Sequence, residues 1–281
     1  MTAGSIPHVA VLVKHAPRRV SIDPLSGAVT ADPRDAGMSS ADAAALELAL
    51  TLGASVTVIT AGPDEAVETL REAFSVGATS LVHIPAPADA ASALVAEALA
   101  GACHGTDLVV CGDYSSDRGS GSVPAFVAAH LGIAQALGVV AVAAQESTGV
   151  LMVERRLDRG RRERLRLAGR AVVSVEGSVA RLRRASLQGV LEAKTAVVDV
   201  RSPRAGLFAA ARGEPIASET KPHRPRVQLR PTPDPAADPI LRVRQVTDAT
   251  SSRNPPRTVT AEPAEAAAII VDSLQEWGYL Q

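Results

Sequence analysis

The sequence predicts an α/β fold built on an open, mostly parallel sheet with helices on both faces, similar to a Rossmann fold. Short runs rich in Val and Ile alternate with helical segments over the first half of the chain. These runs are continuously apolar, which is typical of strands buried on both faces. A loop rich in glycine and serine follows the fourth run, where parallel sheets bind ligands.

The elements of the first half follow one another in a regular order. Ser39 or Ser40 is expected to cap the first helix, and Gly53 to end it. A short hairpin is expected around Ser26 and Gly27. We expect strands at 9–13, 56–59, 81–84 and 107–111, and helices at 41–52, 65–75, 90–102 and 125–131.

After Gly138 the pattern changes to closely spaced strands, which predicts an antiparallel region appended to the sheet. Its strands are expected at 139–144, 150–157, 163–167 and 171–175, with a turn at Asp158-Arg159-Gly160. Residues 1–200 then form one α/β domain. Residues 201–281 form a proline-rich arm with a helix near 262–277, which lies on a partner subunit or is a poorly ordered tail.

The loop from Gly112 to Pro124 has the composition of a phosphate-binding loop. Its glycines let backbone N–H groups approach an anion, its serines add hydroxyl donors, and the following helix start adds partial positive charge. Its spacing matches neither a P-loop nor a dinucleotide fingerprint, so a flexible connection fits the loop equally well. Asp117 would bond a ribose hydroxyl or cap the next turn, and Arg118 would pair with phosphate or lie in solvent.

Composition excludes several classes of function. The net charge of −1 gives no attraction to nucleic acid, and the arginines between 155 and 170 are not interleaved with aromatic residues. The two cysteines suggest neither a disulfide framework nor a metal site, which favours the cytoplasm. No apolar run is long enough for membrane insertion, and no catalytic Ser/His/Asp or Cys/His set has supporting context.

Several segments, in the same order along nearly the whole chain, resemble the beta subunit of electron transfer flavoproteins. Family members commonly carry an aromatic ring where this chain has Ala41 and the stretch Arg18–Ser21, so we expect a specialised bacterial branch. The similar segments are Val11–Lys14, Met38–Glu47, Thr60–Pro63, the loop Gly112–Pro124, Val153–Gly160, Leu187–Lys194 and Asn254–Arg257.

The resemblance implies a subunit that carries electrons and makes or breaks no bonds itself. It implies a heterodimer with an alpha subunit, which holds most of a shared FAD, and electron relay from a flavin-linked dehydrogenase to a quinone-linked acceptor. The beta subunit would hold a structural AMP or, in electron-bifurcating members, a second FAD. A stand-alone AMP- or ATP-binding sensor of the same fold is the alternative, although such a module does not need the arm.

The resemblance also implies site residues. It places partner recognition on Leu187, Gln188, Gly189, Val190 and Leu191. It places cofactor binding on Val13, Lys14, Ala61, Gly62, Gly112, Asp117, Arg118, Gly119, Ser120, Gly121, Ser122 and Val123. Neither a catalytic residue nor a metal ligand is expected.

Overall fold

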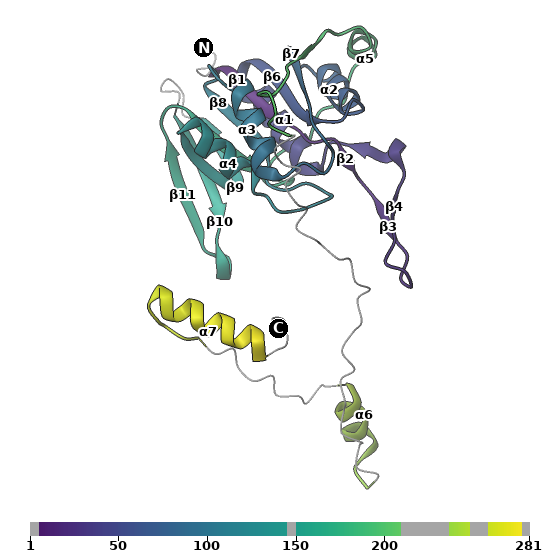
Figure 1. The fold of residues 1–281 in the computed structure, drawn as a ribbon, viewed down its shortest axis with the longest axis vertical. Coiled ribbons are helices and arrows are strands. Elements are labelled where there is room, and N and C mark those ends of the chain that lie inside the picture. The colour runs from purple at the N-terminus through teal and green to yellow at the C-terminus, as the bar shows by residue number, and fades with distance from the viewer. Residues whose placement is uncertain (1–5, 145–149, 209–235, 248–257, 277–281) are drawn as a thin grey trace. The chain divides into compact units, whose positions relative to one another are not determined.

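A computed structural model shows an α/β architecture, as the sequence predicts (Figure 1). It describes residues 6–144, 150–208, 236–247 and 258–276. The chain groups into two compact units, residues 1–222 and residues 223–281. The described part of the second unit consists of α6 (Pro239–Thr247) and α7 (Pro263–Glu276) with short flanking segments. The first unit contains the sheet and the candidate site.

The strands at the centre of the sheet are parallel and continuously apolar, as is typical of strands buried on both faces. Val11 pairs with Val58 on one side and Val110 on the other, and all three side chains are fully buried. The parallel strands lie in the order β12 (Ala171–Val175), β8 (Leu108–Gly112), β1 (Ile6–Leu12), β6 (Gly53–Gly62), β7 (Ser80–Pro85) and β13 (Val198–Val200).

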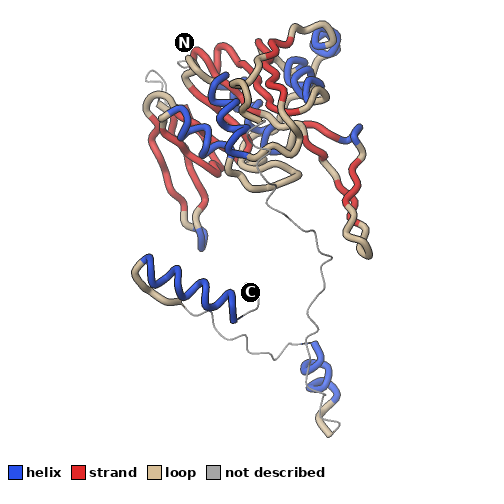
Figure 2. The backbone as a smooth tube through the Cα atoms, in the orientation of Figure 1, coloured by secondary structure: helices blue, strands red, loops and turns tan. Residues whose placement is uncertain are grey.

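Helices cover both faces of the sheet, as predicted, and each face has its own core (Figure 2). Adjacent residues of a strand point to opposite faces, so Val58 packs in one core and Ile59 in the other. The helices α1 (Ser40–Leu52) and α2 (Ala66–Ser75) contribute to the first core, and α3 (Ser92–Ala102) and α4 (Val123–Leu131) to the second.

The appended antiparallel region is present, but its composition differs from the prediction. It consists of β9 (Ala134–Ala144), β10 (Leu151–Arg156) and β11 (Arg162–Leu167). The prediction that 171–175 belongs to it is wrong, since β12 pairs in parallel with β8 and with the start of β9. Every residue of β12 is buried, and such a strand needs cover on both faces.

The strand β9 also begins earlier than predicted, because Gly138 lies inside it. Gly138 has a φ of 65°. Its N–H donates to Ser174 Oγ at 3.0 Å, near the point where the pairing of β9 with β12 shifts register. A glycine within a strand often marks a bulge of this kind. From the sequence, this glycine is expected to be the boundary before the strand.

A hairpin of β3 (Val20–Ile22) and β4 (Val29–Ala31) projects from the sheet domain, as predicted around Ser26 and Gly27 (Figure 1). Its register places the apolar side chains of both strands on one face and the polar Ser21 and Thr30 on the other. The exposed fractions are 48% for Val20, 61% for Ile22 and 64% for Val29. This apolar face is therefore open to solvent in the isolated chain.

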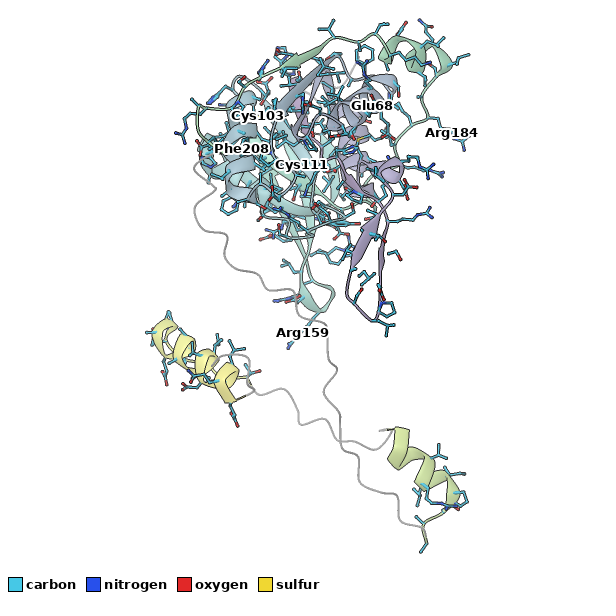
Figure 3. The ribbon with its side chains drawn as sticks, turned by 45° about the vertical axis from the view of Figure 1, so that its right-hand side comes forward. Glu68, Cys103, Cys111, Arg159, Arg184 and Phe208 are labelled. Atoms are coloured by element: carbon cyan, nitrogen blue, oxygen red, sulfur yellow. The ribbon has the colours of Figure 1, made fainter. Side chains whose placement is uncertain are left out.

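The arginines of β10 and β11 are largely neutralised by nearby glutamates. Glu154 accepts from both Arg162 and Arg164, and Arg155 pairs with Glu163 at 3.3 Å. Arg159 lies at the tip of this hairpin, away from the sheet (Figure 3). Ion pairs on an exposed hairpin are typical of a solvated surface.

The first residues of the predicted arm lie against the sheet domain. The N–H of Arg201 donates to the His83 carbonyl at 2.9 Å, and Arg204 pairs with Glu97 on α3 at 3.0 Å. Leu207 is 3% exposed and packs in the second core. Residues 209–235, most of the proline-rich stretch, lie outside the described residues. None of the helices in the described segments is long and apolar enough to cross a membrane.

Candidate functional site

A pocket of about 430 Å³ lies at the carboxyl ends of β1, β6, β7 and β8. Parallel sheets bind ligands at this edge, and the volume is within the range of small-molecule sites. Its walls come from the ends of these strands, the start of α4, and the base of the β3–β4 hairpin. Lining residues include Val13, Lys14, Ala61, Gly62, Pro87, Ala90, Cys111, Gly112, Asp113 and Ser122, with Ala31 and Pro33 from the hairpin base.

The start of α1 packs directly under the end of β8. Ser39 caps the helix, since its Oγ accepts from the Asp42 N–H at 3.0 Å, while Asp42 Oδ2 accepts from the Ser39 N–H at 3.4 Å. Asp42 Oδ2 also accepts from the Lys14 N–H at 3.2 Å. A Cβ on Gly112 would lie 2.6 Å from Asp42 Oδ1, so only glycine permits this approach.

The carboxyl group of Asp42 is held in a dry environment. Burial raises its pKa to about 6, although hydrogen bonds from the backbone of Lys14 and Ser39 act in the opposite direction. Ionisation of Asp42 therefore lowers the stability of the folded state. Its place in the first helical turn confirms the capping role that the sequence favours over acid–base chemistry.

The entry to α4 presents backbone donors to the pocket. Gly121 has a φ of 59°, and a Cβ there would lie 2.5 Å from the Asp113 carbonyl oxygen. Ser122 is the N-cap residue but makes no side-chain cap bond, and its Oγ lies 3.0 Å from Ser120 Oγ. The first N–H groups of α4 thus lack a side-chain acceptor at a helix end that carries partial positive charge.

Side chains tie the 113–122 loop to three other segments around the pocket. Lys14 Nζ pairs with Asp117 Oδ2 at 2.6 Å, Ser116 Oγ donates to the Pro17 carbonyl at 2.7 Å, and Arg118 Nη1 donates to the Ala90 carbonyl at 2.8 Å. These bonds join the loop to the end of β1, to β2 (Ala16–Pro17) and to the segment after β7. The loop is thereby fixed across the pocket.

These ties also identify partners for Asp117 and Arg118 that the sequence did not indicate. Partial burial raises the pKa of Asp117, but hydrogen bonds from Lys14 and Ser115 outweigh it, so the pKa lies below the ordinary value. Asp117 is therefore ionised at neutral pH. Arg118 is exposed, and its bond to Ala90 anchors the loop.

The family model for the electron transfer flavoprotein domain matches residues 28–205, which is more than half of the chain and includes most of the pocket. The chain belongs to the electron transfer flavoprotein domain family. The resemblance noted in the sequence is therefore confirmed.

Curated relatives of this electron transfer flavoprotein family member carry the name electron transfer flavoprotein subunit beta. The proteins from Mycobacterium tuberculosis (strain ATCC 25618 / H37Rv) and Mycobacterium bovis are 36% identical over 184 residues, which cover 60% of this chain and 66% of theirs. The Mycobacterium leprae protein is 38% identical over 154 residues, covering 52% of this chain and 56% of its own length. The chain thus spans just under two thirds of the first two relatives.

The structure brings together nearly all the residues at which the family resemblance places cofactor binding. Eleven of the twelve line the pocket. Gly119, with a φ of 63°, belongs to the same loop but does not line the pocket. Segments more than 100 residues apart in sequence therefore meet at one place, and whether they bind a cofactor stays a prediction.

The predicted recognition residues of this flavoprotein family member lie elsewhere, on α5 (Leu187–Ala193). Leu187 is 77% exposed and Leu191 54% exposed, whereas Gly189 packs closely against the Ser75 carbonyl of α2. Arg71 Nη1 donates to the carbonyls of Ala193 and Lys194 at 2.6 and 2.7 Å, which holds the end of the helix. A firmly anchored helix thus presents two leucines to solvent.

Sequence reasoning missed part of the pocket wall. Asp113 and Tyr114 belong to the predicted loop but are not among the predicted site residues, and neither are Pro87 and Ala90. The last two follow the carboxyl end of β7. The rule that ligands bind beyond the carboxyl ends of parallel strands would have found them, had it been applied to this third strand.

Two further reactive side chains that line the pocket, those of His15 and Cys111, are both uncharged at neutral pH. Burial lowers the pKa of His15, whose Nδ1 lies 2.8 Å from Thr69 Oγ1. Burial likewise raises the pKa of the Cys111 thiol well above its usual range. At pH 7 a neutral imidazole is a poor general acid, and a protonated thiol is a poor nucleophile.

Proposed function

We propose that this chain is the beta subunit of an electron transfer flavoprotein. In the cytoplasm, with an alpha subunit, it relays electrons from a flavin-linked dehydrogenase through a shared FAD to a quinone-linked acceptor. Its own pocket holds an adenine nucleotide, either AMP or the adenosine part of a second FAD. The observation that carries this proposal is that most of the pocket lies in the family-matched region and that the pocket collects eleven of the twelve predicted binding residues.

The residues of the pocket fit a nucleotide. The start of α4, with Ser120 and Ser122 beside it, offers hydroxyl and N–H donors to a phosphate. The apolar Val13, Ala61 and Val123 provide surface for a base. These groups bind and orient the ligand, and none of them is placed to make or break a bond.

When bound, the FAD supplies the electron-accepting chemistry. This chain binds the nucleotide and docks the partner proteins. The exposed leucines of α5 provide an apolar surface for the dehydrogenase, and residues 201–281 supply an arm whose part beyond residue 208 lies on the alpha subunit. The arm, which a stand-alone sensor does not need, and the exposed leucines of α5 both favour a subunit over such a sensor.

Co-expression with an alpha subunit tests the proposal. We expect a yellow heterodimer with a flavin absorbance band, and mass spectrometry of the denatured complex to detect AMP or an excess of FAD. A colourless pair that does not associate contradicts the proposal. A monomer that binds AMP or ATP without any partner supports the sensor instead.

The Ser120→Ala/Ser122→Ala variant tests the pocket itself. Loss of two hydroxyl donors should lower bound nucleotide at least tenfold, since each hydrogen bond to a charged group contributes about 1.5–3 kcal/mol. The circular dichroism spectrum should be unchanged because both side chains lie at the surface of the pocket mouth. Ser26→Ala, in the hairpin turn, is the matched control. Unchanged nucleotide content in the double variant contradicts the assignment.

A further inference from the structure

The β3–β4 hairpin leaves the sheet domain beside the pocket, at a short base. This base is the antiparallel pair of β2 and β5 (Ala36–Gly37). Burial ends here, since Ala16 and Met38 are 2% and 5% exposed, whereas every residue of β3 and β4 is exposed. Ala31 and Pro33 line the pocket but lie beyond the base. The position of this pocket wall therefore depends on the direction in which the hairpin leaves the domain.

Arg18 joins the base of the hairpin to the domain. Its Nε atom donates to the Met38 carbonyl at 3.3 Å, and its Nη2 atom pairs with Glu72 on α2 at 3.1 Å. Its backbone N–H donates to the Asp35 carbonyl at 2.9 Å. The guanidinium group lies directly over Gly37, where a Cβ would be 2.4 Å from Nη2. One residue thus contacts both sides of the base and a helix of the first core.

The other side-chain hydrogen bonds of this region do not replace the connection to α2. Those that the structure shows for residues 20–34 stay within the hairpin. Ser116 Oγ donates to the Pro17 carbonyl at 2.7 Å, but Ser116 belongs to the other loop of the pocket. Within the described residues, the connection of the hairpin base to a core helix therefore rests on the side chain of Arg18.

We propose that Arg18 is a positioning residue, which fixes the hairpin base as a wall of the nucleotide pocket and thereby slows release of the bound nucleotide. This inference rests on the proposed function and deepens it. Arg18 does not line the pocket, so it acts through the wall and not by contact with the ligand. A wall that is fixed before binding loses less conformational freedom on binding, and differences of this kind appear mainly in the dissociation rate.

The connection is weak enough to be removed without unfolding the domain. The side chains of Arg18 and Glu72 are 41% and 46% exposed, and an ion pair in solvent contributes little to stability. Loss of the pair should therefore change the melting temperature by less than about 3 °C. Its effect on the pocket wall can then be measured in a folded protein.

Dissociation of AMP from the full chain tests the inference. The chain is loaded with radiolabelled AMP, excess unlabelled AMP is added, and the loss of label is followed by rapid filtration. Arg18→Ala should release AMP about 3- to 10-fold faster than the wild type, the effect expected for one exposed ion pair and one hydrogen bond. Arg34→Ala removes an ion pair with Asp32 inside the hairpin and should release AMP at the wild-type rate.

Glu72→Gln tests the same connection from the other side and keeps the test valid if Arg18→Ala does not fold. It leaves the base unchanged and should also speed release of AMP. The double variant should release AMP no faster than Arg18→Ala alone, because the two side chains act as one pair. Glu68→Gln, an exposed glutamate of the same helix that does not line the pocket, should match the wild type. Additive effects of the two substitutions contradict the inference.

Hydrogen exchange without ligand provides a readout that does not depend on the nucleotide. In Glu72→Gln, backbone amides of residues 17–36 should exchange about 3- to 10-fold faster, whereas those of α3 and α4 should keep the wild-type rate. Unchanged exchange at the base overturns the inference, as does release of AMP at the wild-type rate in both single variants. A wild type that does not bind AMP overturns the proposed nucleotide site, and the inference with it.

Discussion

The two loops that border the pocket differ in what holds them. The 113–122 loop is tied by Lys14, Pro17 and Ala90 to separate parts of the sheet domain. In the hairpin, the side-chain hydrogen bonds of residues 20–34 that the structure shows stay within the hairpin, as in Asp23 with Ser26 and Asp32 with Arg34. Side-chain hydrogen bonds thus tie the first loop to the body of the protein, whereas those of the hairpin residues tie the hairpin only to itself.

The difference separates a binding function from a contact function. A loop fixed before its ligand arrives loses little conformational freedom on binding, which favours affinity. A two-stranded hairpin with an exposed apolar face is marginally stable by itself. The hairpin base nevertheless reaches the pocket through Ala31 and Pro33. Substitutions in the two loops should therefore change the free energy of unfolding by different amounts.

The largest effect is expected from Asp42, the buried acid beneath the fixed loop. Its folded pKa of about 6 lies above the ordinary value of 3.8. The folded state then binds more protons, so stability falls as pH rises through this window, by about 3 kcal/mol. Asp42→Asn should flatten that slope in urea unfolding measured at pH 4, 5, 6 and 7.

The control for Asp42 lies in the hairpin. Asp32 is exposed, and its pKa is lowered by its hydrogen bonds with Arg34. The contribution of Asp32 to stability changes only below the pH range in which Asp42 titrates. Asp32→Asn should therefore keep the wild-type dependence of unfolding free energy on pH between pH 4 and 6. A wild-type slope in Asp42→Asn would contradict the burial argument.

A smaller effect is expected from glycine substitutions in the two loops. In Gly112→Ala the new methyl group meets Asp42 Oδ1 at 2.6 Å, and overpacking of this kind costs about 2 kcal/mol. Gly27→Ala, in the hairpin, meets no atom within 4 Å and should cost about 1 kcal/mol for its φ of 72°.

Urea unfolding at pH 7 measures both glycine variants. Gly101→Ala serves as the reference, because it has open space and lies within α3, where alanine is the better helix former. We expect it to be neutral or slightly stabilising. If Gly112→Ala matches Gly101→Ala, then the close packing of α1 under β8 is not required.

The smallest effect is expected on the apolar face of the hairpin. The triple variant Val20→Thr, Ile22→Thr, Val29→Thr keeps β-branched side chains at exposed positions and should change unfolding free energy by less than about 0.5 kcal/mol. Val58→Thr, the same type of change in the buried centre of β6, should cost about 2 kcal/mol. Chemical denaturation of the isolated chain compares them, and a large loss in the triple variant would show that the hairpin is packed.

Continuously apolar segments were sufficient to predict most of the fold. β1, β6, β7 and β8 were predicted because buried parallel strands carry little polar alternation, and the cap at Ser39 followed from helix-end chemistry. β12 has the same apolar character, yet its partner was predicted wrongly because adjacency in sequence was taken for adjacency in the sheet. Neither β13 nor α6, which begins at Pro239 after a proline-rich stretch, was predicted.

The site was predictable in location but not in bonding. Positions at the ends of strands follow from topology, whereas the pairing of Lys14 with Asp117 joins residues far apart in sequence. Likewise the burial of the Asp113 Oδ1 atom, which has no hydrogen-bond partner among the described residues, depends on the neighbours that surround it in space. Periodicity and motif spacing contain no information on such contacts.

The place of β12 also determines when the sheet can be completed. Backbone pairing joins the antiparallel strands to the rest of the sheet through β12, which lies between β8 and β9. A nascent chain that ends before Ala171 therefore has β9, β10 and β11 but lacks the strand that connects them to β8. Pairings of high sequence separation form slowly. Synthesis must thus pass this strand before the two halves of the sheet become one cooperative structure.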